Sequence, residues 1–354
     1  MSDLPHFQRA WRVVARGPPS KALRLESDLP IPTRIPPGNA LVKVQAGGLN
    51  PVDYKLMKLL PNFAAGRPTI AAFEFSGVIV DGNGTEWQSG DNIVADLDPR
   101  RTFKTKQGAL AEYVFVPEKN MVRRPERVTP IEASGVLLVG QTAWQALFHV
   151  GGLSEDGAGQ TIFISGGSTA VGSFAIQFAK AKGYRVIATA SGKNEQYVRD
   201  LGADEFIDYT TIDLRKYLVD NPLTTKYSLF LEAVGTLDNA LLYLYSQKFL
   251  VPGGVFVDVG PQPKGVGEIP KLAKLVFGLI RPRWLGGVEQ KFRVFSAEPK
   301  QDDMKAIFTL IAEEKVRPLV DSVFEFGDVV KAYERVMSQR ATGKVIIKVD
   351  PTAD

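Results

Sequence analysis

The hydrophobic pattern near the start of the chain is that of short β-strands. Apolar and polar residues alternate over "ALVKVQAGGL" (residues 40–49), as they do in a half-buried strand. Three more short apolar stretches, "FSGVIVDG", "DNIVADL" and "LAEYVFVP", are separated by Gly, Pro and Asp, which favour turns. Regular short strands with such turns predict a barrel-like β domain.

From about Ile131 onward the pattern changes to strands that alternate with helices. "PIEASGVLLVGQTAWQALFHV" has a helical period and is rich in small residues. The apolar strands "TIFIS", "RVIATA", "EFIDY", "YSLFLEAVG" and "GGVFVDVG" follow, with helices predicted between them, one over 171–182 and one near 194–201. Near-continuous apolar strands separated by helices predict a parallel sheet covered on both faces.

Composition places the chain among ordinary globular proteins. Hydrophobic residues make up 44% and charged residues 23%, and the net charge of +4 is spread without a basic block. That charge suits an anionic ligand but does not indicate nucleic acid. The start, "MSDLPHFQRAWRVV", lacks the apolar core of a secretion signal, and no stretch reaches the roughly 18 apolar residues of a membrane span. We therefore expect a cytoplasmic protein without a transmembrane segment.

The chain is poor in metal-binding and nucleophilic residues. Cysteine is absent, and His6 and His149 are the two histidines. A conventional zinc site and a thiolate nucleophile are thereby excluded. A magnesium or calcium site made of carboxylates alone stays open, although no D-x-D-x-D-G loop is present. We expect no metal.

A glycine-rich turn joins the strand "TIFIS" to the helix after it. Gly167 and Gly172 occupy the first and third positions of a G-x-G-x-x-G fingerprint, Thr169 stands in the middle, and Gly166 adds a further permissive position. Backbone N–H groups at the start of such a helix hold phosphates. An ordinary strand–helix crossover is the alternative, but the strand–turn–helix context favours a cofactor site. The predicted diphosphate-binding residues are Gly166, Gly167, Ser168, Thr169, Ala170, Val171 and Gly172.

The end of the second strand bears on which cofactor binds there. A site for NAD places Asp or Glu at this point to bind the ribose 2′-hydroxyl, whereas this chain has Ala190, Ser191 and Gly192, followed by Lys193. A hydroxyl and an ammonium group would receive a 2′-phosphate. Ser191 and Lys193 therefore favour NADPH, and the alternative is that Lys193 is simply an exposed lysine at the start of a helix.

The order of these segments resembles the medium-chain dehydrogenase/reductase superfamily over nearly the whole chain. The segments are "NPVDYK", "FEFSGVIVDG", "QTAWQAL", "GGSTAVGSFAIQFAKAKGYRVIATAS", "LGADEFIDY", "LEAVG" and the tail "RPLVDSVFEFGDVVKAYERVMSQRATGKVIIKV". They are most similar to the zinc-free quinone oxidoreductase and enoyl reductase branch, particularly its fungal members. Zinc-binding relatives carry a cysteine ahead of the "NPVD" position and Gly-His-Glu where this chain has Phe73-Glu74.

The resemblance implies an α/β fold with two domains. A GroES-like, β-rich catalytic domain is expected over residues 1–130 and 300–354. A Rossmann domain, a doubly wound parallel sheet that binds NADPH, is expected over 131–299. The resemblance also implies a homodimer that pairs through the sheet edge at "VEQKFRVF".

The resemblance further assigns residues to the site. Asn50, Tyr54 and Lys55 become the catalytic candidates, with Asn50 orienting the substrate carbonyl or the cofactor ribose and Tyr54 or Lys55 donating a proton. The alternative for "NPVD" is a plain turn in which Asp53 caps the next helix. The further cofactor candidates are Gln141, Thr142, Tyr209, Val234, Gly235, Val259, Gly260 and Lys344. Packing for Tyr209, a helix cap for Thr142 and a surface turn for Lys344 are their alternatives.

The function implied is an NADPH-dependent, zinc-independent reductase. Its substrates would be small hydrophobic quinones or α,β-unsaturated carbonyl compounds, whose activated C=C bond accepts hydride without a metal. The alternatives are a trans-acting enoyl reductase of a polyketide pathway and an NADPH-binding protein with little activity. The segment 269–287, "IPKLAKLVFGLIRPRWLGG", is expected to be a buried helix leading to the dimer edge. Its alternative is an amphipathic segment that covers the substrate cleft or makes weak contact with a membrane surface.

Overall fold

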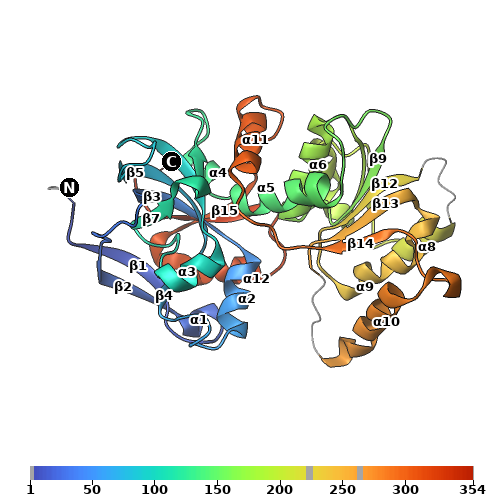
Figure 1. Ribbon diagram of the computed structural model, residues 1–354, viewed down its shortest axis with the longest axis horizontal. Helices are drawn as coiled ribbons and strands as arrows, with labels where there is room; N and C mark the ends of the chain where they lie inside the picture. Colours follow the sequence, from blue (N-terminus) through green and yellow to red (C-terminus); the bar gives the residue numbers. More distant parts are fainter. Residues whose placement is uncertain (1–3, 221–225, 261–265, 354) are drawn as a thin grey trace. The chain divides into compact units, whose positions relative to one another are not determined.

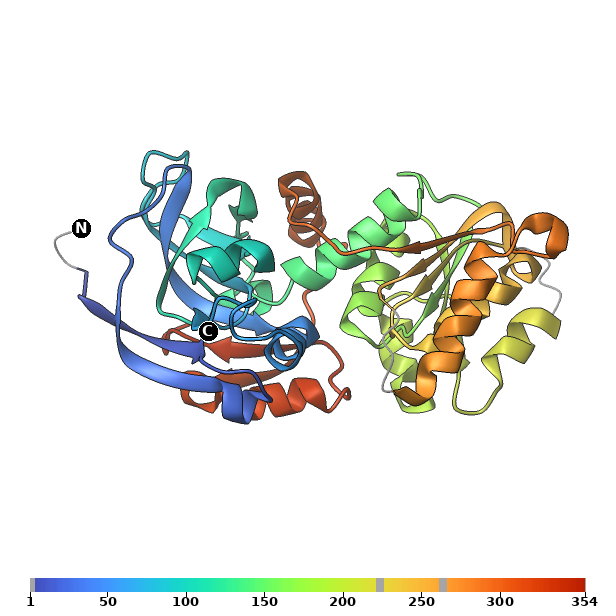
Figure 2. The same ribbon diagram turned by 60° about the horizontal axis from the view of Figure 1, so that its bottom comes forward.

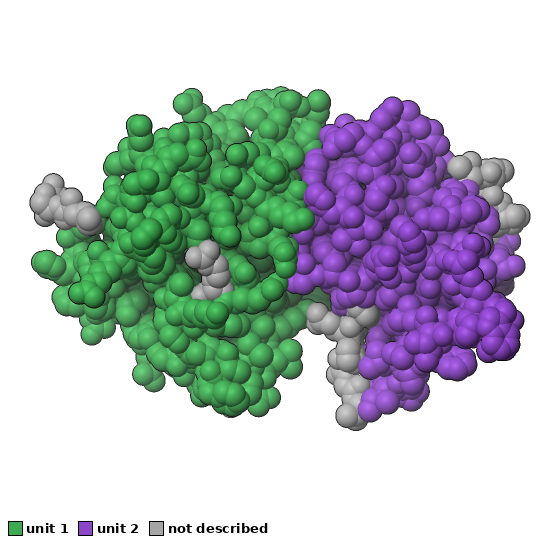
Figure 3. Space-filling view, viewed as in Figure 1, with its two compact units in different colours: residues 1–141, 298–354 green, residues 142–297 purple. Residues whose placement is uncertain are grey.

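A computed structural model describes residues 4–220, 226–260 and 266–353 of the chain. The chain forms two compact units, coloured separately in Figure 3: unit 1 contains residues 1–141 and 298–354, and unit 2 contains residues 142–297. The predicted domain boundaries were 130/131 and 299/300. The segment 131–141 belongs to unit 1, and α4 (Pro130–Ala133), which begins it, packs against four strands of that unit.

Unit 1 is built on two β-sheets. The larger sheet has seven strands in the described residues, in the order β15-β16-β3-β5-β6-β8, with β7 also paired to β3. These strands are β3 (Asn39–Leu49), β5 (Glu74–Asp81), β6 (Asn92–Asp96), β7 (Tyr113–Pro117), β8 (Met121–Arg123), β15 (Val320–Glu325) and β16 (Lys344–Lys348). The smaller sheet, in the order β2-β1-β4, consists of β1 (Phe7–Val13), β2 (Leu23–Pro30) and β4 (Thr69–Ile70).

The end of the chain completes the larger sheet of unit 1. Strand β16 pairs antiparallel with β3, with Val345 opposite Leu49, and parallel with β15. This register sets Lys344, at the start of β16, beside Asn50, which follows β3 directly. Figure 1 shows the red C-terminal elements alongside the blue N-terminal ones.

The helices of unit 1 are short. They are α1 (Pro19–Ala22), α2 (Pro51–Leu59), α3 (Pro99–Thr105), α4, α5 (Leu137–Trp144, which continues into unit 2), α11 (Gln301–Ala312) and α12 (Val329–Met337). The helix α2 begins where the sequence predicts a strand to break, at Asn50-Pro51. Pro51 fits the first helical position because its missing N–H would have no partner there.

Unit 2 is a parallel sheet between helices. The strand order is β11-β10-β9-β12-β13-β14, and every pair is parallel. Counted from β9 this is the order 3-2-1-4-5-6 of a Rossmann sheet, so the predicted doubly wound sheet is confirmed. Its strands are β9 (Thr161–Ser165), β10 (Arg185–Ala190), β11 (Glu205–Asp208), β12 (Tyr227–Glu232), β13 (Leu250–Asp258) and β14 (Lys291–Val294).

Helices cover both faces of the unit 2 sheet. They are α6 (Ala170–Ala181), α7 (Glu195–Asp200), α8 (Leu214–Asp220), α9 (Leu237–Ala240) and α10 (Ile269–Ile280). In Figure 1, α6 lies on one side of the sheet and α9 and α10 lie on the other. Within the described residues, no helix is long and apolar enough to cross a membrane.

A row of aromatic rings forms the centre of the unit 2 sheet. Phe163 of β9, Phe230 of β12 and Phe256 of β13 stand opposite one another in register. Their rings stack with centroids 4.8 and 4.5 Å apart. Stacked aromatic pairs add about 1 kcal/mol each beyond the area that they bury. The row fixes the register of the strands that carry the glycine turns described next.

Candidate functional site

The Gly-rich turn lies at the carboxyl end of β9 and leads into α6. Gly166 has a φ of +85°, a conformation that favours glycine. A Cβ on Gly172 would lie 2.2 Å from the carbonyl oxygen of Gly166, so α6 packs against the turn because residue 172 has no side chain. A Cβ on Gly167 would lie 3.1 Å from the Cβ of Ala188, in tight contact with β10.

Thr169, which replaces the middle glycine of the fingerprint, is the N-cap of α6. Its hydroxyl oxygen accepts a hydrogen bond from the Gly172 N–H at 3.0 Å, and its hydroxyl donates to the Gly166 carbonyl at 2.8 Å. The hydroxyl therefore ties the two ends of the turn together. The N–H groups of Ala170 and Val171 lie in the first helical turn, where no carbonyl within the helix can accept from them.

Two more glycine turns lie beside this one, at the carboxyl ends of β12 and β13. A Cβ on Gly166 would lie 2.5 Å from Cγ2 of Val234, so the first and second turns are in contact. A Cβ on Gly235 would lie 3.0 Å from the carbonyl oxygen of Gly260, so the second and third turns are also in contact. Gly235 and Gly260 both have positive φ, +78° and +116°. The structure therefore brings these predicted residues together, with Val259 beside Gly260 in the chain.

Buried carboxyl groups hold the second and third turns. Glu232 accepts hydrogen bonds from the N–H groups of Val234 at 3.0 Å and Gly235 at 2.6 Å. Asp258 accepts from the Gly260 N–H at 2.8 Å. Burial raises the pKa of Asp258 to about 8, and the nearby charge of Glu232 adds to the effect. Neither carboxyl group is among the residues predicted from the sequence.

The turn after β10 carries the residues expected near a ribose. Ser191 is partly buried and Lys193 is exposed. A Cβ on Gly192, between them, would lie 2.5 Å from Oδ2 of Asp208 at the end of β11. Hydrogen bonds from the Thr210 hydroxyl and N–H, with one from the Gly192 N–H, lower the pKa of Asp208. Tyr209 follows, with its side chain half exposed.

These features fit a dinucleotide. The sheet order reverses between β9 and β12, and ligands of open α/β sheets bind at the carboxyl ends of strands at such a reversal. Three glycine turns and the start of the 12-residue helix α6 meet there. Ser191, which follows β10, and Tyr209, which follows β11, lie along the same edge of the sheet.

In unit 1, Lys344 lies in a buried polar network. Its Nζ donates to Oε1 of Glu74 at 2.6 Å and to Oδ1 of Asn50. The Asn50 side chain donates in turn to the same Glu74 oxygen at 2.7 Å, and the Leu138 N–H donates to the other Glu74 oxygen at 2.9 Å. Lys344 is 3% exposed. The surface turn that was the alternative for this residue is therefore wrong.

The network continues into the first turn of α2. Asp53 accepts from the Asn50 N–H at 2.8 Å, so the aspartate of "NPVD" caps this helix as the alternative interpretation expected. The Tyr333 hydroxyl donates to the same carboxyl oxygen at 3.4 Å. Burial raises the pKa of Asp53 to about 7, although the Asn50 N–H and the Lys344 charge oppose the rise. Asn50, the N-cap of α2, is fully buried, and its side-chain amide binds Glu74 and Lys344.

Burial shifts the pKa values of the two candidate proton donors on α2 in opposite directions. Tyr54 is buried in the hydrophobic core of unit 1, and this burial raises the pKa of its hydroxyl. Lys55 is partly buried, and burial lowers the pKa of its ammonium group. A lysine with a lowered pKa is the better proton donor near neutral pH.

Gln141 is buried in unit 1, where its side-chain amide links Asp96 to the backbone of Lys300. Its amide nitrogen donates to the Asp96 carboxylate at 3.0 Å, and its amide oxygen accepts from the Lys300 N–H at 2.8 Å. Burial raises the pKa of Asp96 well above its usual range. Thr142, the next residue, is partly buried within α5.

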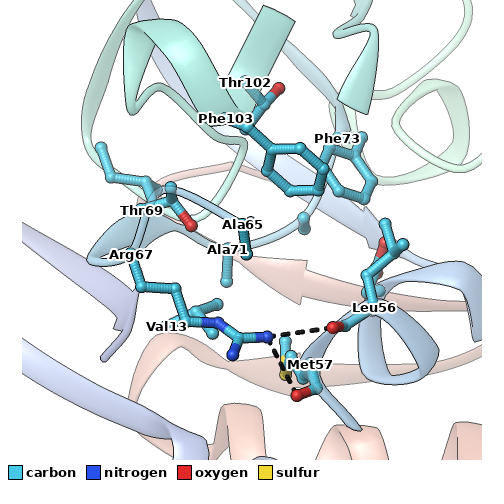
Figure 4. Close-up of a pocket in the computed structure, with 13 residues that line it drawn as sticks. Val13, Leu56, Met57, Ala65, Arg67, Thr69, Ala71, Phe73, Thr102 and Phe103 are labelled. Atoms are coloured by element: carbon cyan, nitrogen blue, oxygen red, sulfur yellow. Dashed lines mark hydrogen bonds between the residues drawn. The ribbon is translucent and has the colours of Figure 1, made fainter. Parts of the chain in front are cut away.

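A small cavity lies behind α2, as Figure 4 shows. Its volume of about 20 Å³ suits one water molecule, and it is too small for a substrate. The Arg67 guanidinium donates across it to the carbonyl oxygens of Leu56 at 3.0 Å and Met57 at 2.9 Å. Arg67 thereby binds carbonyls in the last turn of α2, where a positive charge is favourable. These hydrogen bonds from Arg67 help to fix α2 in place.

No metal-binding cluster occurs in the part of the chain that the structure describes. Nowhere in those residues do three or more His, Cys, Asp or Glu side chains group so that they could hold a metal ion. Glu74, at the position of the zinc-binding Gly-His-Glu in relatives, has both carboxylate oxygens bound to groups of the protein.

The important residues that the sequence interpretation missed share one signal. Glu74 begins the largely apolar strand β5, and Asp96, Glu232 and Asp258 end strands β6, β12 and β13. A charged residue in such a strand is buried with partners, since burying it without partners costs several kcal/mol.

Comparisons with known proteins agree over nearly the whole chain. Two family descriptions match: "Alcohol dehydrogenase GroES-like domain" over residues 36–126 and "Zinc-binding dehydrogenase" over residues 201–347. The trans-enoyl reductase pgmF of Aspergillus terreus is 34% identical over 366 residues, with 99% of each chain covered. The medium chain reductase pydE of Acremonium sp is 30% identical over 368 residues, covering 96% of this chain and 98% of its own.

A solved structure is similar over the same length. The quinone oxidoreductase from Coxiella burnetii has a TM-score of 0.76 and 25% sequence identity to this chain. The likeness covers 97% of this chain and 100% of the other.

Proposed function

The chain belongs to the medium-chain dehydrogenase/reductase superfamily of nicotinamide-dependent oxidoreductases, and from this premise we propose that it is an NADPH-dependent reductase of quinones or of C=C bonds conjugated to a carbonyl group. The observation that carries the proposal is the meeting of three glycine turns and the start of α6 where the strand order of unit 2 reverses. When bound, NADPH supplies a hydride for the substrate.

The residues of the turn would bind the diphosphate. Thr169 already satisfies the Gly172 N–H, so the Ala170 and Val171 N–H groups remain to face the phosphates. Glu232 and Asp258 fix the second and third turns through backbone N–H groups. They would act as positioning residues and would not touch the cofactor.

NADPH is proposed over NADH because of the turn after β10. Lys193 is exposed there and offers a positive charge for a 2′-phosphate, with the Ser191 hydroxyl two residues before it. Asp208 also lies beside this turn and is held ionised by its hydrogen bonds to Thr210 and Gly192. Lys193 would have to offset that negative charge, which makes it the residue that decides the preference.

Lys55 is the proposed proton donor. The developing enolate or hydroquinone needs a proton, and the lowered pKa of Lys55 makes it a stronger acid than an ordinary lysine. Tyr54, whose pKa is raised, is the weaker candidate. We expect Lys55→Met to reduce kcat by about 100-fold, the lower range for general-acid catalysis, and Tyr54→Phe to change it little. Steady-state rates across pH 5–9 check this, and the opposite ranking would assign the role to Tyr54.

Catalysis is proposed to be zinc-independent. The chain has no cysteine, and the Glu74 carboxylate is occupied by Lys344, Asn50 and Leu138. An enone or quinone can accept hydride without a metal because the negative charge spreads onto the carbonyl oxygen. Activity that survives dialysis against a chelator is the expected outcome.

The deciding experiment is an assay of NADPH oxidation with 2-alkenals, enones and quinones. Turnover with at least one of these acceptors supports the proposal. NADPH binding without turnover would contradict it and favour a low-activity binding protein instead.

A trans-acting enoyl reductase of a polyketide pathway is the second candidate function. The 34% identity to a trans-enoyl reductase over 99% of both chains favours it. Reduction of an enoyl thioester bound to a carrier protein, at least tenfold faster than reduction of free enones and quinones, would distinguish it from the first proposal.

A homodimer through β14 is proposed for the assembled protein. This strand forms one edge of the unit 2 sheet, so its outer N–H and C=O groups can pair with a second copy. Light scattering coupled to size exclusion tests the assembly.

A further inference from the structure

The helix α10 presents apolar side chains outward. Residues 269, 273, 276, 277 and 280 recur at the helical period and lie on one face of this 12-residue helix. We call these residues, Ile269, Ala273, Val276, Phe277 and Ile280, the outer stripe. Its four large side chains are between 46% and 70% exposed. The expected buried helix is therefore wrong for the single chain.

The opposite face holds α10 to unit 2. Leu275 is buried in the hydrophobic core of the unit. A Cβ on Gly278 would lie 2.1 Å from Cδ2 of Leu244, so the helix packs closely on the preceding 3₁₀ segment (Leu241–Lys248). Lys271 adds an ion pair with Asp238 at 2.7 Å. The inner face of α10 therefore packs against unit 2, whereas the outer stripe is not part of the hydrophobic core.

The exposed apolar surface continues past the end of the helix. Trp284 is 83% exposed and Leu285 is half exposed, in a 3₁₀ turn (Arg283–Leu285) that follows α10. Figure 2 shows α10 along the outside of unit 2. An exposed tryptophan next to an amphipathic helix is typical of a segment that lies at the interface between lipid and water.

The charged residues within this segment are all basic. Residues 269–287 contain Lys271, Lys274, Arg281 and Arg283 and no acidic residue. Lys271 is paired with Asp238 and Glu268, and Arg283 with Glu289, so in the described part of the chain Lys274 and Arg281 are the two that show no ion pair. Lys274 and Arg281 lie on α10 and at its C-cap, outside the stripe. A helix with an apolar face and basic flanks binds anionic lipid through both features at once.

We propose that α10 and the Trp284 turn bind the surface of a bilayer that contains anionic phospholipid. The outer stripe and Trp284 lie at the level of the lipid headgroups, and the basic residues contact lipid phosphates or carboxylates. The helix lies on the bilayer and does not cross it. The proposal is independent of the enzymatic activity.

Charge argues against a second copy of the chain as the occupant of this surface. A two-fold contact would bring the same patch of both copies together. Lys274 and Arg281 of each copy would then face a patch of equal charge, which is unfavourable. Anionic lipid has the complementary charge.

The test is co-sedimentation of the full chain with vesicles. One set is phosphatidylcholine alone, and the other contains phosphatidylcholine with one quarter phosphatidylserine. We expect binding to the second set to exceed binding to the first by at least tenfold and to weaken between 0.05 and about 0.5 M salt, because screening shortens the reach of the charges.

Trp284 supplies a site-specific signal. The other three tryptophans, Trp11, Trp87 and Trp144, are buried. Vesicles with phosphatidylserine should therefore shift the tryptophan emission to the blue, and Trp284→Phe should remove that shift.

Two variants and a matched control locate the contact. Phe277→Ser with Ile280→Ser removes apolar side chains from an exposed face, and we expect vesicle binding to fall at least tenfold while the thermal unfolding temperature is kept. Lys274→Glu with Arg281→Glu should abolish the preference for phosphatidylserine. Phe63→Ser is the control, since Phe63 is 87% exposed in unit 1, far along the chain from α10.

Three outcomes would overturn the proposal. The first is no binding to either vesicle, and the second is binding that the stripe and charge variants leave unchanged. The third is a dimer in solution that the Phe277→Ser and Ile280→Ser pair dissociates, which would assign the surface to a second copy.

Discussion

Asp258 shows how a single residue can couple the turn at the end of β13 to pH. Its pKa in the folded protein is about 8, above the ordinary value of 3.8, because it is buried beside Glu232. The folded state therefore holds a proton that the unfolded state releases. The stability from this group is fully present below pH 3.8 and is lost as the pH rises through 8.

Asp258→Asn removes this titration. We expect the free energy of unfolding of the wild type to fall relative to the variant by up to about 1.4 kcal/mol per pH unit between pH 5 and 8. Urea denaturation of both proteins at four pH values in this range measures the difference. A difference that stays constant with pH would mean that Asp258 is already ionised in the folded protein.

Lys193 is expected to set the preference for the phosphorylated cofactor. Lys193→Ala should raise KM for NADPH about tenfold and leave KM for NADH unchanged, since a charged hydrogen bond of roughly 1.4 kcal/mol is lost from one cofactor only. Initial rates with each cofactor measure it. Lys216→Ala, an exposed lysine on α8, is the matched control. An equal effect on both cofactors would place Lys193 away from the 2′-phosphate.

At the residue scale, the sequence indicated positions better than roles. It located the turn 166–172 and "NPVD", and the capping role of Asp53 was foreseen as an alternative. It did not indicate that Lys344 is buried against Glu74, because residues 270 positions apart meet only through the pairing of β16 with β3. Proximity of that kind depends on topology, which the local pattern does not contain.

The start of α6 is where one element carries both a structural and a proposed binding role. Thr169 caps the helix with its hydroxyl, and a valine has the same shape without the hydroxyl. Thr169→Val should lower the free energy of unfolding by about 1 kcal/mol and raise KM for NADPH, whereas Thr169→Ser should behave as the wild type.

Thr169→Gly restores the common fingerprint and provides the contrast. A glycine at an N-cap costs only a few tenths of a kcal/mol relative to threonine. Denaturation and steady-state kinetics on the three variants separate the capping effect from the binding effect. Equal stability of Thr169→Val and the wild type would argue against the cap.

Element prediction worked where the hydrophobic period was strong. The strand expected over 40–49 is β3 (Asn39–Leu49), and the helix expected over 171–182 is α6 (Ala170–Ala181). The segment 269–280 was correctly seen as helical in period, but its environment was wrong. Apolar residues on both faces of a helix predict burial, and only the structure shows that one face is left exposed by residues 4–220, 226–260 and 266–353.

At the scale of the whole molecule, the predicted fold class is confirmed: a GroES-like β-rich domain with a Rossmann parallel-sheet domain. The resemblance to a family supplied the discontinuous GroES-like unit, which hydrophobic periodicity alone could not supply. The parallel sheet of unit 2, in contrast, follows from the alternation of strands and helices, while its strand order comes from the structure.

The ion pair between Lys344 and Glu74 joins the two ends of the chain within unit 1. Both side chains are buried, so removing one partner leaves an uncompensated charge. Lys344→Met should lower the free energy of unfolding by about 3–5 kcal/mol, and the double variant with Glu74→Gln should recover most of the loss. Denaturation of the four proteins of this double-mutant cycle measures it, and a loss that the double variant does not recover would contradict the pairing.

The place of β16 in the sheet has a consequence for the order of events during synthesis. Its residues, 344–348, leave the ribosome after all of unit 2, yet β3 and β15 both pair with it. Unit 2 is continuous in sequence and is available to fold while the ribosome is still translating the tail. The N-terminal strands of unit 1 cannot complete their sheet until β16 has been made. Until then, the backbone N–H and C=O groups along the edge of β3 are unpaired and accessible to other chains. A nascent chain stalled before residue 344 should therefore recruit chaperones to its first 141 residues rather than to its middle.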